Sequence, residues 1–109
     1  MPDLKLPEPI AAYFNADKRD GEAIARCFTT RAIVKDEGQT HCGPAAIKAW
    51  KTEASAKYSY TSEPFAVEEK EGRYVVTSRL TGNFPGSPVD LRFVFRLEGR
   101  KIVFLEITP

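Results

Sequence analysis

The chain lacks an excess of charge of either sign. Its 109 residues include 16 lysines and arginines against 15 aspartates and glutamates, for a formal net charge of +1. A nucleic-acid-binding surface needs basic side chains gathered on one face, because affinity comes largely from neutralising phosphates and releasing counterions. The balance of charges therefore predicts no nucleic acid among the partners of this protein.

Cysteine is also scarce, and long apolar runs are missing. Two cysteines, Cys27 and Cys42, are too few for the disulfide framework of a small secreted domain. The longest apolar stretches, such as residues 93–95, are far shorter than a membrane-spanning helix. The first seven residues do not follow the basic-then-apolar order of a signal peptide. These absences predict a cytoplasmic protein with no membrane partner.

The single histidine, His41, limits the metal chemistry that is open to the chain. Cys27, His41 and Cys42 offer at most three soft ligands, two of them adjacent in sequence, which is poor spacing for tetrahedral zinc. The sequence has no glycine-rich phosphate loop, nucleophile elbow or dinucleotide fingerprint. We therefore expect neither a metal nor a cofactor.

Hydrophobic residues make up 42% of the chain, which is enough for one core. At this length folding hides roughly two-thirds of the surface of the unfolded chain. No repeat, low-complexity tract or linker divides the sequence. Three early prolines predict an extended arm over residues 1–8, and a single domain is expected over residues 9–109.

The first half of the chain predicts three helices. Apolar side chains recur at helical spacing in two successive segments, which indicates two short helices over roughly residues 9–28. Asp20 is a suitable N-cap for the second of them. Gly43 as cap and Pro44 at the first position begin a third helix. The apolar side chains that define these helices are Ile10, Tyr13 and Phe14, then Ile24, Cys27 and Phe28, then Ala46, Ile47, Trp50 and Ala54.

The rest of the chain predicts strands, because apolar and polar residues alternate between polar turns. The expected strands cover residues 31–37, 39–42, 58–67, 73–84, 89–97 and 101–108. A polar turn is expected over residues 68–72 and a tight hairpin at Glu98 and Gly99. Helices gathered on one face of a curved antiparallel sheet make an α+β domain.

Three motifs in this order resemble the nuclear transport factor 2-like superfamily, which includes ketosteroid isomerases and SnoaL-like polyketide cyclases. They are DGEAI at residues 20–24, VKD at residues 34–36 and GPAAIKAW at residues 43–50. The resemblance implies a cone-shaped sheet wrapped around three helices, with an apolar pocket that holds a hydrophobic small molecule. It also implies a homodimer.

The resemblance places the family's general-base aspartate at Asp36. The family's oxyanion-hole tyrosine falls at Ala12, one position before Tyr13, and its proton-donating aspartate falls at Phe93. Because such donors supply a large share of the rate, their loss argues against a true ketosteroid isomerase.

Asp36 is the first candidate for chemistry. If Val34 faces the core, the period of two places Ala32 and Asp36 on the same face. A carboxylate in an apolar cone could then take a proton from the carbon next to a carbonyl group. If Ile33 faces inward instead, Asp36 only opens a turn in water.

Three further polar residues have two interpretations each. His41 either lines the pocket and assists Asp36, or it is a surface histidine. Tyr13 is either a hydroxyl donor or a core residue. Arg79 either points inward to bind an acidic substrate, or it lies on the outer face of the sheet paired with a carboxylate. The residues expected to line the pocket, which are also ordinary core residues, are Phe14, Val34, Trp50, Phe93 and Phe95.

The sequence therefore predicts cofactor-free proton transfer on a hydrophobic carbonyl compound, leading to isomerisation, cyclisation or dehydration. Asp36 would be the base, with His41 and Tyr13 assisting. Two alternatives stay open: a non-catalytic domain that binds an apolar ligand, and a dimerisation or docking module. For the homodimer, the outer face of the strand over residues 89–97 predicts charge-paired contacts that weaken as salt rises. That face carries Asp90, Arg92, Val94 and Arg96.

Overall fold

The computed structural model of the chain describes residues 5–16 and 21–109, and in these ranges three helices are packed on one six-stranded sheet. The helices are α1 (Glu8–Ala16), α2 (Gly21–Ala25) and α3 (Gly43–Lys57). The strands are β1 (Phe28–Asp36), β2 (Gln39–Cys42), β3 (Tyr60–Lys70), β4 (Arg73–Gly82), β5 (Val89–Glu98) and β6 (Lys101–Thr108). The predicted α+β class and the curved sheet are confirmed.

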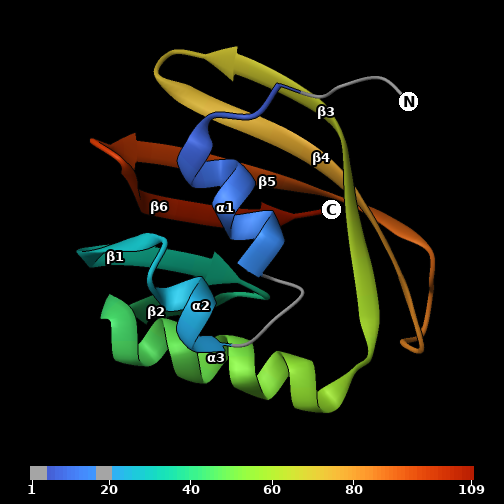
Figure 1. Cartoon of the computed structure of the whole chain (residues 1–109). Helices are drawn as coiled ribbons and strands as arrows, with labels where there is room; N and C mark the ends of the chain where they lie inside the picture. Colours follow the sequence, from blue (N-terminus) through green and yellow to red (C-terminus); the bar gives the residue numbers. More distant parts are fainter. Residues whose placement is uncertain (1–4, 17–20) are drawn as a thin grey trace.

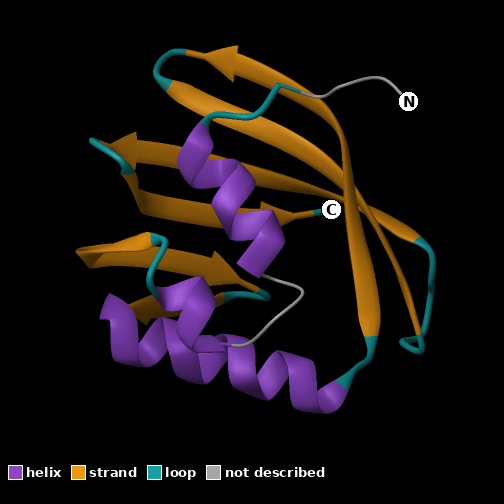
Figure 2. Cartoon of the chain, viewed as in Figure 1, coloured by secondary structure: helices purple, strands orange, loops and turns teal. Residues whose placement is uncertain are grey.

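Figure 1 shows how the sheet bends around the helices. Helix α1 lies across the concave face in front of β5 and β6, while α2 and α3 lie beside β1 and β2. The long strands β3 and β4 curve away from this group and return toward the end of α3. Coloured by secondary structure, the helices all lie on the same side of the sheet (Figure 2). None of the helices in the described ranges is long and apolar enough to cross a membrane.

The sheet is mixed, which corrects the prediction of a purely antiparallel one. Its order is β2-β1-β6-β5-β4-β3, and β1 runs parallel to β6 with Val34 beside Leu105 and Asp36 beside Ile107. All other neighbouring strands are antiparallel. The parallel pair joins two strands that are far apart in the sequence. No local pattern of residues therefore predicts it.

Several predicted boundaries are also corrected. Helix α2 ends at Ala25, and Phe28 begins β1 instead of continuing the helix, because it pairs with Ile102 of β6. Strand β3 extends to Lys70, so the turn into β4 is only two residues long. Helix α3 begins at Gly43 as expected, but Cys42 and not Gly43 is its N-cap residue. The proposed N-cap Asp20 lies outside the described residues.

The core is built around a cluster of five aromatic rings, which we call the aromatic cluster: Tyr13, Phe14, Phe28, Phe93 and Phe95. The Tyr13 ring is 5.1 Å from that of Phe14 and 5.4 Å from that of Phe95, both in edge-to-face arrangement. This geometry is favoured because the positive ring edge meets the negative ring face. Helix α1 is therefore fixed to β5 by aromatic contacts.

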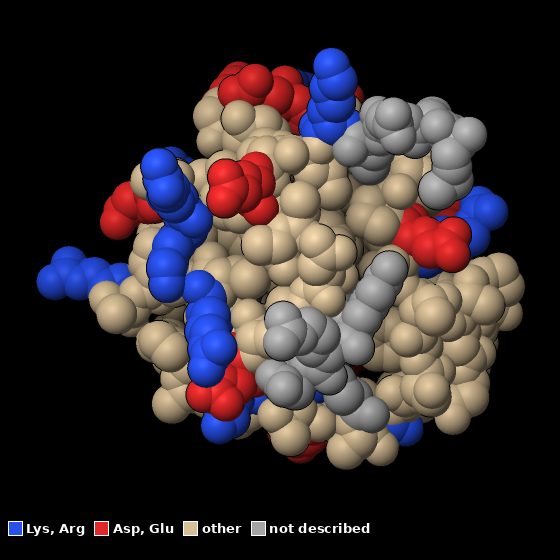
Figure 3. Space-filling view, viewed as in Figure 1, with Lys and Arg blue, Asp and Glu red and all other residues tan. Residues whose placement is uncertain are grey.

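Charged side chains are mixed on the surface. Figure 3 shows lysine, arginine, aspartate and glutamate side chains on one face, with both signs next to each other along its edge. On this face several lysine and arginine side chains follow one another down the left side of the view, and acidic side chains lie beside them.

Candidate functional site

Asp36 lies at the end of β1 on the face that meets the helices. Ala32 and Val34, four and two residues earlier, are fully buried, so the alternation along β1 turns the Asp36 side chain toward the same side. There the indole Nε1–H of Trp50 donates a hydrogen bond of 3.0 Å to Asp36 Oδ2. A hydrogen bond to a charged acceptor is stronger than one between neutral groups, so the indole fixes this carboxylate in direction.

Helix α3 supplies the indole because it packs against β1 and β2 with one apolar side. Ile47 and Trp50, one helical turn apart, are both buried on that side. The described part of the chain provides no other hydrogen bond to the Asp36 carboxylate. Its second oxygen is therefore open to whatever enters the adjoining pockets.

His41 lies near Asp36 on the neighbouring strand. Strands β1 and β2 are joined by the two-residue turn Glu37-Gly38, and the register places His41 opposite Val34. Residues that pair across a sheet share a face, so His41 and Asp36 project to the same side. The half-buried His41 ring is 5.9 Å from the Trp50 ring, and no hydrogen bond joins His41 to Asp36 within the described ranges.

Two pockets meet at Asp36. The small pocket has a volume of about 220 Å³ and is enclosed by α3, the β1–β2 turn and the start of the segment that follows α3. Its walls include Asp36, His41, Trp50, Glu53 and Tyr58. The large pocket has a volume of about 580 Å³ and lies where β1 and β6 end and β5 begins. Asp36 is part of the wall of both.

The two pockets differ in chemistry. Beside Asp36, the large pocket has the apolar side chains of Leu91 and Ile107, and its volume falls within the range of about 300–1,000 Å³ that is usual for ligand sites. The small pocket lies below that range. Three carboxylates and one lysine line each pocket, but the exposed wall of the small pocket is mainly polar, whereas that of the large pocket is mainly apolar. Asp36 thus lies between a pocket of ligand size with an apolar part and a smaller, more polar pocket.

The other predicted site residues lie elsewhere. Tyr13 is 1% exposed inside the aromatic cluster, and it lines neither pocket. Of the five residues expected to line an apolar pocket, Trp50 lines the small pocket, and the remaining four, Phe14, Val34, Phe93 and Phe95, are buried in the core. The structure therefore brings together Asp36, His41 and Trp50, and it places Tyr13 apart from them.

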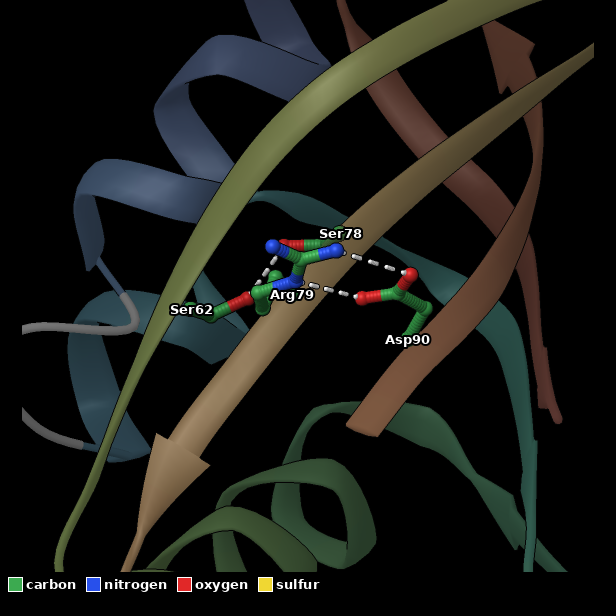
Figure 4. A network of polar contacts seen from close by, with 4 residues as sticks. All are labelled: Ser62, Ser78, Arg79 and Asp90. Atoms are coloured by element: carbon green, nitrogen blue, oxygen red, sulfur yellow. Dashed lines mark hydrogen bonds and ion pairs between the residues drawn. The ribbon is translucent and has the colours of Figure 1, made fainter. Parts of the chain in front are cut away.

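Arg79 lies on the outer face of β4, as the second interpretation of this residue has it. Its guanidinium donates two hydrogen bonds, of 2.9 and 3.4 Å, to the carboxylate of Asp90 on β5 (Figure 4). Arg79 is thus paired with a carboxylate on the outer face and lines neither pocket. The hydrogen bond between them lowers the pKa of Asp90, and the same bond, with the charge of the carboxylate, raises the pKa of Arg79. The guanidinium also lies 5.6 Å from the ring centre of Phe65, which is 51% exposed.

Sequence reasoning missed two buried polar features. Lys51 on α3 is 4% exposed and donates a hydrogen bond to the Tyr60 hydroxyl group of β3. Ser62 and Ser78 face each other from β3 and β4 with their hydroxyl oxygens 2.7 Å apart (Figure 4). The burial of the two serines could have been predicted, since each lies at an inward position of its strand. The burial of Lys51 could not, because it does not follow the apolar pattern of α3.

Neither the two cysteines nor the acidic residues of the described ranges form a metal centre. No group of three or more potential ligands comes together in residues 5–16 and 21–109. Cys27 is half-buried with its thiol on the carbonyl oxygen of Ala23, and burial raises its pKa. Cys42 is exposed.

No family model and no curated protein matches the chain, but solved structures do. A candidate polyketide cyclase from Sinorhizobium meliloti is 36% identical, with a TM-score of 0.89 over 94% of this chain and 95% of that one. A protein of ketosteroid isomerase-like fold from Catenulispora acidiphila is 18% identical, with a TM-score of 0.85 over 96% of this chain and 87% of that one.

A protein of the nuclear transport factor 2-like group from Cytophaga hutchinsonii is 11% identical, with a TM-score of 0.73 over 98% of this chain and 92% of that one. The last two likenesses show the fold alone, whereas the first is close enough in sequence to show kinship. The chain therefore belongs to the nuclear transport factor 2-like superfamily, the group that also contains the ketosteroid isomerases and the polyketide cyclases.

Proposed function

We propose that this protein transfers a proton on a hydrophobic carbonyl compound, without a cofactor, and that Asp36 is the general base. The observation that carries the proposal is the place of this carboxylate. It lines a pocket of about 580 Å³ whose wall includes the apolar side chains of Leu91 and Ile107, while the Trp50 indole holds one of its oxygens at 3.0 Å. A base works only when its free oxygen is aimed at the proton it removes, and a carboxylate bound through one oxygen leaves the other free.

In this proposal the ligand binds in the large pocket, with its apolar body on Leu91 and Ile107 and its acidic C–H near Asp36. The protonated carboxyl group then returns the proton to another carbon of the ligand, which is an isomerisation, or passes it on through the small pocket. His41 lines that small pocket and can accept or donate a proton near neutral pH. The 36% identical candidate polyketide cyclase supports a carbonyl-rich ligand.

The experiment measures proton transfer directly. β-Tetralone, an apolar ketone with acidic protons next to its carbonyl group, is incubated with the protein in deuterated water, and loss of the proton signal is followed by NMR. We expect exchange above the buffer rate and a loss of about a hundredfold or more in Asp36→Asn. Glu71→Gln is the matched control, because Glu71 is an exposed glutamate at the same place in the turn between β3 and β4 and lines neither pocket. Equal losses in both variants would contradict the role of Asp36.

A second candidate function is non-catalytic binding of an apolar ligand. The position of Tyr13 favours it, because a tyrosine in the aromatic cluster supplies no hydroxyl group to a ligand in either pocket. The chain has a single tryptophan, Trp50, and its indole is bonded to Asp36, which lines both pockets. Its fluorescence therefore reports a ligand that binds beside Asp36. Tetralone binding that changes this fluorescence equally in the wild type and in Asp36→Asn, with no exchange in either, identifies a binding protein.

We also propose a homodimer through the outer face of the sheet. Arg92 and Arg96 are exposed there on β5, and Phe65 on β3 adds an exposed apolar side chain to the same face, where it meets Arg79. Charged contacts across a two-fold axis weaken as ions screen them. Light scattering at low and high salt tests this: a monomeric mass at low salt and high protein concentration would end the idea.

A further inference from the structure

Lys51 on α3 has an unusual environment for a lysine. It is 4% exposed, and no other charged side chain in the described part of the chain is buried. Lysine is almost never buried without partners, because removing an ammonium group from water is costly. The proposed reaction uses Asp36 and His41 and assigns nothing to Lys51.

The contacts of the Lys51 ammonium group include two aromatic rings and a hydroxyl group. Its Nζ donates a hydrogen bond to the hydroxyl oxygen of Tyr60, the first residue of β3. It lies 4.9 Å from the centre of the Tyr60 ring and 5.7 Å from that of the Trp50 ring. A cation within about 6 Å of a ring centre is attracted by the negative face of the ring.

Trp50 connects this ammonium group to the candidate base. Its ring is next to Lys51, and its Nε1–H is bonded to Asp36 Oδ2 at 3.0 Å. A positive charge against the indole ring restrains the tilt of the ring and withdraws electron density from it, which makes the N–H group a better donor. Tyr60, Lys51, Trp50 and Asp36 thus form one continuous series of contacts.

We propose that Lys51 is a positioning residue, whose ammonium group orients Trp50 and thereby aims the Asp36 carboxylate where the two pockets meet. The inference rests on the proposed function, since the aim of Asp36 matters for chemistry only if Asp36 is the base. Arginine can replace lysine in this role, because a guanidinium group also binds to aromatic faces. A lysine that merely joins α3 to β3 would affect stability and leave the bond between Trp50 and Asp36 unchanged.

The test uses the full chain labelled with ¹⁵N. Since Trp50 is the only tryptophan, the protein has a single indole N–H resonance, and this resonance reports the bond to Asp36. In Lys51→Met, which keeps a long apolar side chain without the charge, we expect the indole proton to move upfield and to exchange with water about threefold faster or more. Lys51→Arg is expected to restore the wild-type values.

Lys48→Met is the matched control. Lys48 is on the same helix, but it is exposed and lines neither pocket. This variant is expected to leave the indole resonance unchanged. Wild-type resonance and exchange in Lys51→Met, or the same change in Lys51→Arg as in Lys51→Met, would overturn the proposal.

If Lys51→Met does not fold, Tyr60→Phe removes the hydroxyl group that binds the ammonium group and leaves the charge in place. A smaller upfield movement is then expected, and an unmoved resonance would overturn the proposal. Tetralone exchange separates the two proposals, because the resonance does not depend on turnover. A moved resonance in a protein without exchange activity contradicts the proposed function alone. Wild-type exchange in Lys51→Met, with an unmoved resonance, contradicts the positioning role alone.

Discussion

The aromatic cluster and the small pocket lie on the same helix-covered face of the sheet, but different side chains fill the space between sheet and helices. In the cluster, α1 meets β5 through rings that are at most 6% exposed. In the small pocket, α3 meets β1 and β2 through Trp50, while Asp36 and His41 remain half-exposed. The first region removes apolar surface from water, and the second keeps polar groups near it.

Because of this difference, we expect that substitutions in the aromatic cluster change mainly the stability of the fold, and that substitutions around Asp36 change mainly the chemistry of the site. Burial of large rings supplies stability roughly in proportion to the area removed from water. A carboxylate that is to react with a ligand has to remain accessible, so it contributes less. The comparison predicts large stability effects in the cluster, and smaller ones around Asp36 that affect the site instead.

The largest effect is expected for Phe95→Ala. The side chain is fully buried, and its ring is 5.4 Å from Tyr13 and 5.9 Å from Phe14, so its removal leaves a cavity among rings that cannot close. The expected loss in free energy of unfolding is about 3–5 kcal/mol, measured by urea denaturation. Asp36→Ala is the matched variant in the other region and should cost about 1–3 kcal/mol, because it leaves the indole N–H without its acceptor. Equal losses would remove the distinction between the regions.

The next effect concerns the hydroxyl pair of Ser62 and Ser78, which is a polar feature inside the buried region. The oxygens are 2.7 Å apart, and the residues are 6% and 0% exposed. Either single change to alanine leaves the other hydroxyl group without this partner, at a cost of about 1–3 kcal/mol. The double variant should cost no more than either single one, because both polar groups are gone. Additive losses in urea denaturation would show that the two groups do not depend on each other.

The sequence predicted those parts of the fold that rest on local patterns. The alternation along β5 correctly indicates that Phe93 and Phe95 are buried while Arg92 and Arg96 are exposed. The same period of two along β1 relates Asp36 to the buried Val34. These inferences hold because side chains in a strand alternate between faces whatever the strand pairs with.

Other features depend on contacts between distant segments and could not be predicted. Phe28 fits the helical spacing of α2 as well as it fits a strand, and its pairing with Ile102 decides the outcome. The hydrogen bond between Trp50 and Asp36 exists because α3 packs on β1. From the sequence, Lys51 is expected to be a solvent-exposed helix residue. Its burial depends on the contact with Tyr60, which no local pattern shows.

A smaller effect compares two turns of the same kind. Glu37-Gly38 joins β1 to β2 with φ angles of 51° and 75°, and Glu71-Gly72 joins β3 to β4 with φ angles of 53° and 77°. A glutamate strains the backbone in this left-handed region, whereas asparagine tolerates it, so each change to asparagine should stabilise the protein by up to about 1 kcal/mol.

The two turns should differ in their effect on the site. Glu37 lines both pockets, and Glu71 lines neither. We therefore expect Glu37→Asn to change Trp50 fluorescence or tetralone binding, while Glu71→Asn changes only the thermal midpoint. If Trp50 fluorescence responds equally to both variants, the turn next to Asp36 does not affect the site more than the distant turn does.

The smallest effect is expected on the outer face, at the ion pair of Arg79 and Asp90. The hydrogen bond from Arg79 lowers the pKa of Asp90, and a carboxyl group with a lowered folded pKa contributes stability above its unfolded pKa of about 3.9. That contribution is lost as the pH falls through the folded pKa, so Asp90→Asn should be slightly less stable than wild type at neutral pH and equal to it in acid. Both side chains are exposed, so salt should also shrink the difference. Thermal melts of both proteins at neutral and acid pH, with and without added salt, test this. A difference that persists in acid and in high salt would mean that Asp90 acts through packing and not through its charge.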